Sequence, residues 1–244
     1  MSAARLRVTT AQSQPLNCLI SLKVGSTFLR NLIYILDHNT PFSTDEKAFP
    51  QELPTRELTR EELAEDVSFF VVRDPIARFF SLYFDKVAGK PENRFHFVTD
   101  KLIEHRIFHD GPALSIEQHR ENCMSLLGFL GVRLRGKIKG PINPHWNKQI
   151  TRIAPAVDFG LKPLMLEQLE TQLMQIAGSR VAGLEAAIGK VNSRNRSPRP
   201  VAVDDVLTPE IYQKISSLYP EDIQLYDLVK TGWELLGYPP EINL

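Results

Sequence analysis

The segment from Leu16 to Leu36 constrains the fold more than any other part of the chain. Its first residues, LNCLISL, form a short and nearly continuous apolar run, which is typical of a strand buried on both faces of a parallel sheet. The turn Lys23–Thr27 interrupts this pattern, and Gly25 within it tolerates backbone conformations that other residues resist. Apolar residues then recur at helical spacing. The segment therefore predicts a strand, a turn and a helix, with Ser26 or Thr27 as the helix cap.

The same turn is suited to an anion. Unpaired N–H groups and the positive end of the dipole make a helix start a good seat for a phosphate-like group, and Lys23 adds a full charge beside it. An ordinary turn with a capping serine fits these residues equally well, so both interpretations stay open. The signature of nucleotide triphosphatases is absent, because it places the lysine after a second glycine, whereas Lys23 precedes the only glycine of the turn.

A second strand followed by basic and hydroxyl residues occurs about fifty residues later. The run Val67–Val72 predicts a buried strand, and Ile76–Val87 has helical spacing. Ligands of open α/β sheets bind outside the carboxyl ends of the strands, so the two turns are expected to face one crevice. Arg73, Arg78 and Ser81 all have side chains suited to phosphate. The alternative is that Arg73 pairs with an acidic residue and Ser81 faces solvent.

Bulk composition restricts the class of protein. The 244 residues include 29 basic and 29 acidic side chains, so any anion site must be local and general nucleic-acid binding is not expected. Cys18 and Cys123, the only cysteines, are far apart, which argues against a disulfide scaffold or a structural zinc site and favours a reducing compartment. No apolar run is long enough to span a bilayer, so the chain as given is expected to be soluble. A chain trimmed of a membrane anchor would have the same pattern.

The order of elements predicts an α/β fold with a P-loop-like parallel sheet flanked by helices, and rich in helix. Residues 1–15 are expected to be a flexible lead-in and residues 16–244 a single domain. A proline-rich excursion is expected from Asp37 to Glu65, with a short helix at Thr59–Ala64, and a third strand at Ala156–Leu161. Further helices are expected at 94–108, 115–130, 164–177, 208–218 and 221–236, and basic loops at 131–144 and 190–200.

Four segments, in this order along the chain, carry a resemblance to a known family. They are KVGST at the first turn, VVRDPIARFFSLYFDK after it, NPHWNKQ at Asn143–Gln149, and VNS at Val191–Ser193. Together they resemble the carbohydrate sulfotransferases of the second large sulfotransferase family, which comprises chondroitin- and heparan-type Golgi enzymes and bacterial relatives. The resemblance covers roughly residues 16–230, and RDPxxRxxSxY is its most specific part.

The resemblance implies transfer of a sulfuryl group from 3′-phosphoadenosine 5′-phosphosulfate (PAPS) to an acceptor hydroxyl, expected to belong to a glycan, with no metal required. It implies that the first turn binds the 5′-phosphosulfate, that the second binds the 3′-phosphate, and that a late loop closes over the nucleotide. The residues implied are Lys23, Gly25, Ser26 and Thr27 for the first, Arg73 and Ser81 for the second, and Asn192, Ser193, Arg194 and Arg196 for the loop. The sequence TRIAP stands where animal members have cysteines, which looks more like a bacterial cytoplasmic relative.

Catalysis is expected to depend on positioning and electrostatics, with Lys23 stabilising the departing oxygen. The candidate general bases are His145, because imidazole titrates near neutral pH, and His38, because some family members use a histidine upstream of the RDP strand. For His145 the alternative is a structural histidine that holds its segment through a backbone hydrogen bond. Glu167 is a weaker candidate for acceptor contact, and the loop Arg133–Lys139 is a candidate site for an anionic glycan.

Two other functions stay open. Asp74 follows a strand as a magnesium-binding aspartate would, which keeps a P-loop kinase as an alternative. A non-catalytic nucleotide- or glycan-binding module of the same fold is the other. The sequence gives no indication of the oligomeric state.

Overall fold

The computed structural model describes residues 4–42, 49–89, 94–95, 98, 103, 108–111, 113–136, 143–191 and 200–242. The chain divides into two compact units. We call them the sheet unit (Met1–Arg73, Gln149–Asn195 and Gln224–Leu244) and the helical unit (Asp74–Lys148 and Arg196–Ile223). Each unit is described by itself, and the single domain expected over residues 16–244 stays a prediction.

The sheet unit is built on a five-stranded sheet in the order β3-β1-β2-β4-β5. Its parallel part consists of β2 (Leu16–Leu19), β4 (Val67–Val72) and β5 (Lys162–Met165). All residues of β2 and β4 are buried, because helices cover both faces of the sheet. The structure confirms the predicted α/β class and its parallel strands at 16–19 and 67–72.

Two antiparallel strands extend this sheet. β1 (Leu6–Ala11) pairs with β2 and with β3 (Thr55–Leu58). The expected flexible lead-in is therefore wrong over Leu6–Ala11, where Leu6 and Val8 are buried while Arg7 is exposed. This alternation is the ordinary signature of a half-buried strand. β3 also lies within the expected excursion, directly before the predicted short helix, α2 (Arg60–Glu65).

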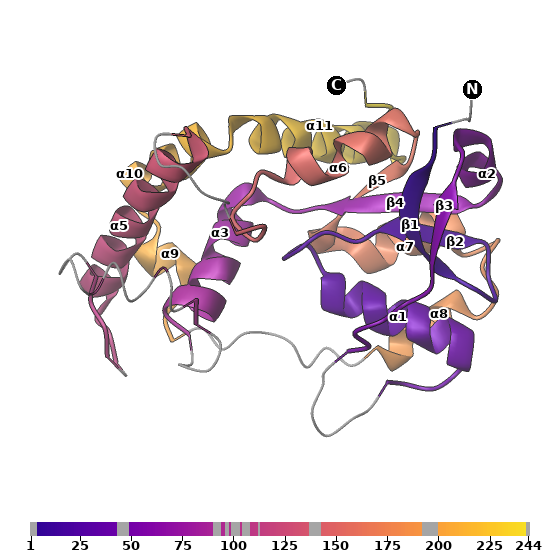
Figure 1. Ribbon diagram of the computed structural model, residues 1–244, viewed down its shortest axis with the longest axis horizontal. Coiled ribbons are helices and arrows are strands. Elements are labelled where there is room, and N and C mark those ends of the chain that lie inside the picture. The colour runs from indigo at the N-terminus through magenta and orange to yellow at the C-terminus, as the bar shows by residue number, and fades with distance from the viewer. Residues whose placement is uncertain are drawn as a thin grey trace. The chain divides into compact units, whose positions relative to one another are not determined.

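Helices flank this sheet on both sides (Figure 1). α1 (Ser26–His38), α7 (Leu169–Ala177) and α8 (Leu184–Lys190) lie on one side. α6 (Gln149–Asp158) and the later part of α11 (Pro220–Leu236) lie on the other. The Trp233 indole on α11 donates a 3.0 Å hydrogen bond to the Pro163 carbonyl, so this helix covers the edge strand β5.

The third parallel strand is displaced from its predicted position. Residues 156–158 belong to α6, Gly160 takes a positive φ of 77°, and the strand begins only at Lys162. Periodicity alone could not separate the apolar end of α6 from a short buried strand. The predicted helix at 164–177 consequently starts later: Leu164 and Met165 pair with β4, a 3₁₀ turn follows at Leu166–Gln168, and α7 follows that turn.

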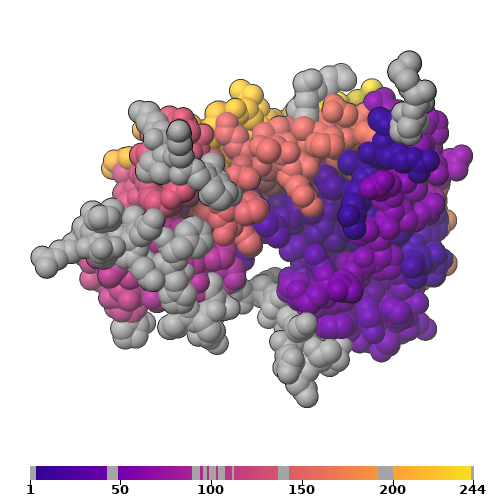
Figure 2. All heavy atoms as spheres, in the orientation of Figure 1, coloured from indigo at the N-terminus to yellow at the C-terminus, as the bar shows by residue number. Residues whose placement is uncertain are grey.

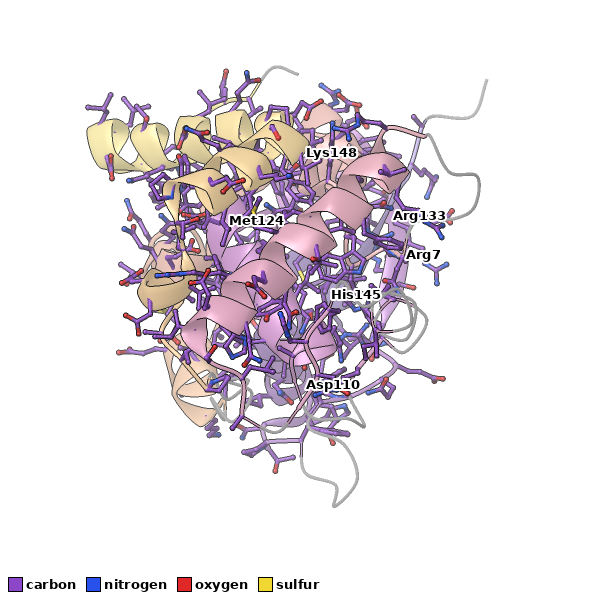
Figure 3. The ribbon with its side chains drawn as sticks, turned by 90° about the vertical axis from the view of Figure 1, so that its left-hand side faces the viewer. Arg7, Asp110, Met124, Arg133, His145 and Lys148 are labelled. Atoms are coloured by element: carbon purple, nitrogen blue, oxygen red, sulfur yellow. The ribbon has the colours of Figure 1, made fainter. Side chains whose placement is uncertain are left out.

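The helical unit contains α3 (Pro75–Leu82), α5 (Ile116–Leu134), α9 (Val203–Val206) and α10 (Pro209–Leu218). α3 continues into a π-helical turn at Tyr83–Val87, so the helix predicted at 76–87 is confirmed with a local change of pitch. α5 runs past its predicted end and takes in Arg133, which Figure 3 labels together with Met124 of the same helix. The helix predicted at 94–108 lies largely outside the described residues.

Aromatic side chains dominate the core of the helical unit. The buried residues include Phe79, Phe80, Tyr83, Phe84 and Trp146.

No helix in the described part of the chain is long and apolar enough to cross a membrane.

The burial of β1 predicts a measurable difference between two adjacent positions. Val8→Ala removes a side chain that is 1% exposed and should lower the free energy of unfolding by about 1–3 kcal/mol. Arg7→Ala, on the exposed face, should change it by less than about 1 kcal/mol. Chemical denaturation of both variants measures the difference. Equal effects would contradict the burial of β1 in the sheet.

Candidate functional site

The turn between β2 and α1 has an unusual backbone. Lys23 and Gly25 both take positive φ angles, 63° and 81°, on either side of the fully buried Val24. A positive φ is uncommon outside glycine and is found disproportionately at ligand-binding turns. Turns that mix left- and right-handed residues can direct successive N–H groups towards one anion. The predicted turn is therefore present, with Lys23 in a strained conformation.

The cap of α1 differs from the prediction. Gly25 is the N-cap residue, and Ser26 and Thr27 are the first residues of the helix rather than its cap. No side-chain oxygen of the described residues caps α1, and the same holds for α7, α8 and α9, whereas α2, α3, α5 and α10 each have a side-chain cap. A helix start that keeps its positive end uncapped by side chains suits an anionic ligand better than an ordinary turn.

Gly25 is required by its neighbour as well as by its φ. A Cβ atom at this position would lie 2.6 Å from Cδ1 of Leu166, the first residue after β5. The segment after β5 thus packs directly against the turn. The exposed Glu167 follows Leu166, and its carboxylate accepts a 3.3 Å hydrogen bond from the Tyr226 hydroxyl. Glu167 therefore lies at the same edge of the sheet, and its contact with an acceptor stays a prediction.

A hydrogen bond joins the two predicted anion turns. Arg73 follows the last residue of β4, and its Nη1 donates to the carbonyl oxygen of Lys23 at 3.1 Å. The parallel pairing of β2 and β4 makes this contact possible, because it places the carboxyl ends of both strands at one edge. The expectation that Lys23 and Arg73 lie together is confirmed.

One residue of this network was missed by sequence reasoning. The Gln149 carboxamide accepts a hydrogen bond from the Arg73 N–H at 3.1 Å and donates one to the Arg73 carbonyl at 2.8 Å. The side chain is only 4% exposed. Gln149 closes the NPHWNKQ segment and opens α6. Gln149 lies in one of the four segments that carry the family resemblance, which was a signal of a functional role. Nothing in the sequence connects it to Arg73, however.

The start of α3, in the helical unit, uses Asp74 as a structural cap. Its Oδ1 accepts hydrogen bonds from the N–H groups of Ile76 at 2.6 Å and Ala77 at 3.2 Å. A carboxylate engaged in this way stabilises the helix start. This geometry gives Asp74 a sufficient structural role and weakens the kinase alternative.

Arg78 does not serve as a surface phosphate ligand. The residue is 6% exposed, and its Nη2 donates to the carbonyl oxygen of His145 at 2.9 Å. Burial lowers the pKa of Arg78, while the nearby Tyr219 and Asp222 act in the opposite direction. Arg78 therefore holds the NPHW segment inside the helical unit. Ser81, one turn further along α3, is half-buried.

The hydrogen bonds around His145 determine its tautomer. Asn143 Oδ1 accepts the backbone N–H of His145 at 3.0 Å, which identifies this atom as the amide oxygen. The same oxygen lies 2.8 Å from Nδ1 of His145. An amide oxygen only accepts hydrogen bonds, so Nδ1 of the neutral imidazole carries the proton and Nε2 carries the lone pair. His145, labelled in Figure 3, lies in the helical unit.

The structure does not bring His38 to the anion turn. His38 is in the last turn of α1, twelve residues beyond Ser26, which corresponds to roughly 18 Å along the helix axis. The preceding residue, Asp37, accepts a 3.0 Å hydrogen bond from the backbone N–H of Ser13, in the turn between β1 and β2. Because α1 runs back along the sheet, His38 lies towards the amino-terminal ends of the parallel strands, away from the Lys23 turn.

Several predicted residues cannot be placed. Asn192, Ser193, Arg194 and Arg196 lie outside the described residues, and so do residues 137–142 of the predicted basic loop. In Figure 2 the indigo and purple atoms belong to the N-terminal part of the sheet unit, which includes β1 and β3. Within the described ranges, no group of three or more His, Cys, Asp or Glu residues is placed to hold a metal ion.

Both cysteines are buried free thiols. Burial raises the pKa of Cys18 to about 12, and it also raises the pKa of Cys123. Neither cysteine is therefore a thiolate nucleophile at neutral pH.

Two glycines form a matched pair that separates a general loss of stability from a loss of anion binding. Gly25 and Gly183 are both N-cap residues with positive φ, but a Cβ at Gly183 meets nothing within 4 Å. Each change to alanine should lower the free energy of unfolding by about 1–2 kcal/mol, since both impose a left-handed conformation on a side chain. Only Gly25→Ala should also weaken binding of an anion at the start of α1, measured by calorimetry with inorganic phosphate as the probe. Equal loss of binding in both variants would contradict the placement of the anion site at Gly25.

Comparisons with known proteins agree with this geometry. A family model described as the sulfotransferase family matches residues 9–228, which is most of the chain. Neither the curated proteins nor the solved structures gave a match. The matched range contains the strand, the strained turn and the uncapped helix, together with Arg73, Gln149 and His145. The chain therefore belongs to the sulfotransferase family, whose reaction is the transfer of a sulfuryl group.

Proposed function

We propose that the protein transfers a sulfuryl group from PAPS to a hydroxyl group of a carbohydrate, and releases adenosine 3′,5′-bisphosphate. The observation that carries the donor assignment is the bond from Arg73 to the carbonyl of Lys23, at the uncapped start of α1. It brings the Arg73 guanidinium to the backbone of the turn that contains Lys23, in a chain whose net formal charge is zero. A nucleotide with two separate anionic groups, a 3′-phosphate and a 5′-phosphosulfate, matches such a local arrangement.

The residues of the turn fit the 5′ end of this donor. Lys23 supplies a positive charge, and the N–H groups at the start of α1 supply hydrogen-bond donors. Gly25 supplies the positive φ of the turn and leaves room for the Leu166 side chain. The resemblance assigns the 3′-phosphate to Arg73 and Ser81, and the guanidinium has the planar geometry that binds two phosphate oxygens at once.

When bound, PAPS supplies an activated sulfuryl group whose leaving group is a phosphate oxygen. The Lys23 ammonium stabilises the negative charge that develops on this oxygen, and Ser26 and Thr27 orient the sulfate. Preorganised charge of this kind usually makes the largest contribution to group transfer between oxygens. Lys23 therefore acts through electrostatics, and the protein has no need of a covalent intermediate.

His145 is the proposed general base. Its Nε2 carries the lone pair in the tautomer that Asn143 selects, and a lone pair is what accepts a proton from an acceptor hydroxyl. Arg78 holds the carbonyl of His145, so the backbone of this residue is anchored as well. Both roles considered from the sequence, the structural and the catalytic, are compatible with this geometry. The position of His38 at the far end of α1 favours His145 over it.

The glycan acceptor is proposed from the resemblance. Beside the proposed base, the Phe95 ring lies 5.1 Å from the His145 ring between centroids, and it is an aromatic group of the kind that binds sugars. The cytoplasmic location expected from the sequence stays a prediction.

The donor assignment predicts nucleotide binding without a metal. Adenosine 3′,5′-bisphosphate should raise the melting temperature in the presence of EDTA, because a ligand at about 100 times its Kd stabilises the folded state by about 2.7 kcal/mol. Lys23→Ala should reduce kcat at least about 100-fold, and Arg73→Ala should mainly weaken nucleotide binding. Differential scanning fluorimetry and transfer from radiolabelled PAPS measure these effects. Stabilisation by ATP with magnesium, and none by the bisphosphate, would support the kinase instead.

The base assignment predicts a selective loss of turnover. His145→Gln should lower kcat by about 10²–10⁴-fold and leave the affinity for the bisphosphate unchanged, since the base acts on the acceptor. His38→Gln should retain activity, because this residue lies at the other end of α1. Steady-state kinetics and calorimetry distinguish the two effects. An active His145→Gln together with an inactive His38→Gln would reverse the assignment.

A further inference from the structure

We infer that Gln149 is a positioning residue, which fixes the direction of the Arg73 guanidinium and, through it, the shape of the Lys23 turn. The inference rests on the proposed function, in which Arg73 binds the 3′-phosphate of the donor. It adds a residue to which neither the family match nor the sequence assigns a role.

The carboxamide of Gln149 takes over the hydrogen bonding of a strand that has ended. Val72 is the last residue of β4 that pairs with β5, opposite Met165. The next peptide groups lose the sheet as a partner, and both the N–H and the carbonyl of Arg73 bind the Gln149 side chain instead, at 3.1 and 2.8 Å. Because Gln149 is buried, an unmade bond here would leave a polar group without water. The backbone of Arg73 is therefore held at two points.

The Arg73 side chain carries this restraint to the first turn. Its Nη1 donates to the Lys23 carbonyl at 3.1 Å, and the five N–H groups of a guanidinium lie in one rigid plane. One bond at Nη1 and a clamped backbone together orient that plane. Lys23 has a φ of 63°, which is unfavourable for a residue with a side chain, and the bond from Arg73 helps to hold it there. Arg73 thus links the proposed 3′-phosphate site to the 5′-phosphosulfate turn.

This arrangement predicts that Gln149 contributes to discrimination between nucleotides. Adenosine 3′,5′-bisphosphate has the 3′-phosphate, whereas adenosine 5′-monophosphate lacks it. A loosened guanidinium should weaken binding of the bisphosphate more than binding of the monophosphate. The ratio of the two affinities is independent of how much folded protein a variant loses, so it separates positioning from a merely structural role.

The test compares Gln149→Met with Gln172→Met in the full chain by isothermal titration calorimetry. Methionine has a similar shape and lacks the amide, so the change removes the hydrogen bonds and keeps the packing. Gln172 is a matched control, because it is 1% exposed and accepts a 2.7 Å hydrogen bond from the backbone N–H of Met165, at the end of the neighbouring strand. Gln149→Met should lower the affinity ratio about tenfold, and Gln172→Met should leave it unchanged.

A second comparison tests whether the effect passes through Arg73. In an Arg73→Ala background, Gln149→Met should produce no further change in the affinity ratio, because the group that it positions is gone. Additive effects of the two changes would overturn the inference. If Gln149→Met does not fold, Gln149→Asn and Gln172→Asn replace the pair, since asparagine keeps a neutral amide on a side chain that is one carbon shorter and so withdraws it from its partners.

The outcomes separate this inference from the proposed function. If the unmodified protein binds the bisphosphate no better than the monophosphate, the proposed 3′-phosphate site is wrong, and the role of Gln149 is wrong with it. If the unmodified protein prefers the bisphosphate and Gln149→Met keeps that preference, only the inference fails. A loss of preference in both glutamine variants would also overturn it, because the effect would then be general to the edge of the sheet.

Discussion

The candidate site depends on one hydrogen bond, from the Arg73 guanidinium to the Lys23 carbonyl. It forms because β2 and β4 are adjacent and parallel, with Leu19 opposite Phe70, so the chain leaves both strands at the same edge. A long separation in sequence is thereby converted into contact between two turns. This hydrogen bond holds the turn that contains the strained Lys23 and Gly25. The start of α1, which has no side-chain cap, follows directly.

Local charge, rather than overall charge, defines the site. The chain has equal numbers of acidic and basic residues, so no general field attracts an anion. What the turn offers instead is a set of fixed dipoles at the start of α1, combined with Lys23 and Arg73. Fixed groups of this kind suit a transfer reaction, because they need little rearrangement as charge develops.

Two arginines of one motif have different roles. Arg73 stands where a strand ends, so its guanidinium stays at the edge of the sheet and contacts a turn. Arg78 stands on the buried face of α3, where it binds the carbonyl of His145 and lies near Asp222. Both arginines have side chains that are suited to phosphate. Burial on α3 gives Arg78 a structural role, and Arg73 stays the proposed phosphate ligand.

The α/β class, the two turns, the helix after each turn and the family were all predictable from the sequence. These features follow from apolar periodicity and from short motifs, which act over a few residues. The tertiary structure decided the rest, because pairing partners and burial depend on residues far apart in the chain. It made a strand of Leu6–Ala11, moved the third parallel strand to Lys162–Met165, and separated His38 from the turn by the length of α1. It also brought Gln149 to Arg73, a contact across 76 positions that no local pattern encodes.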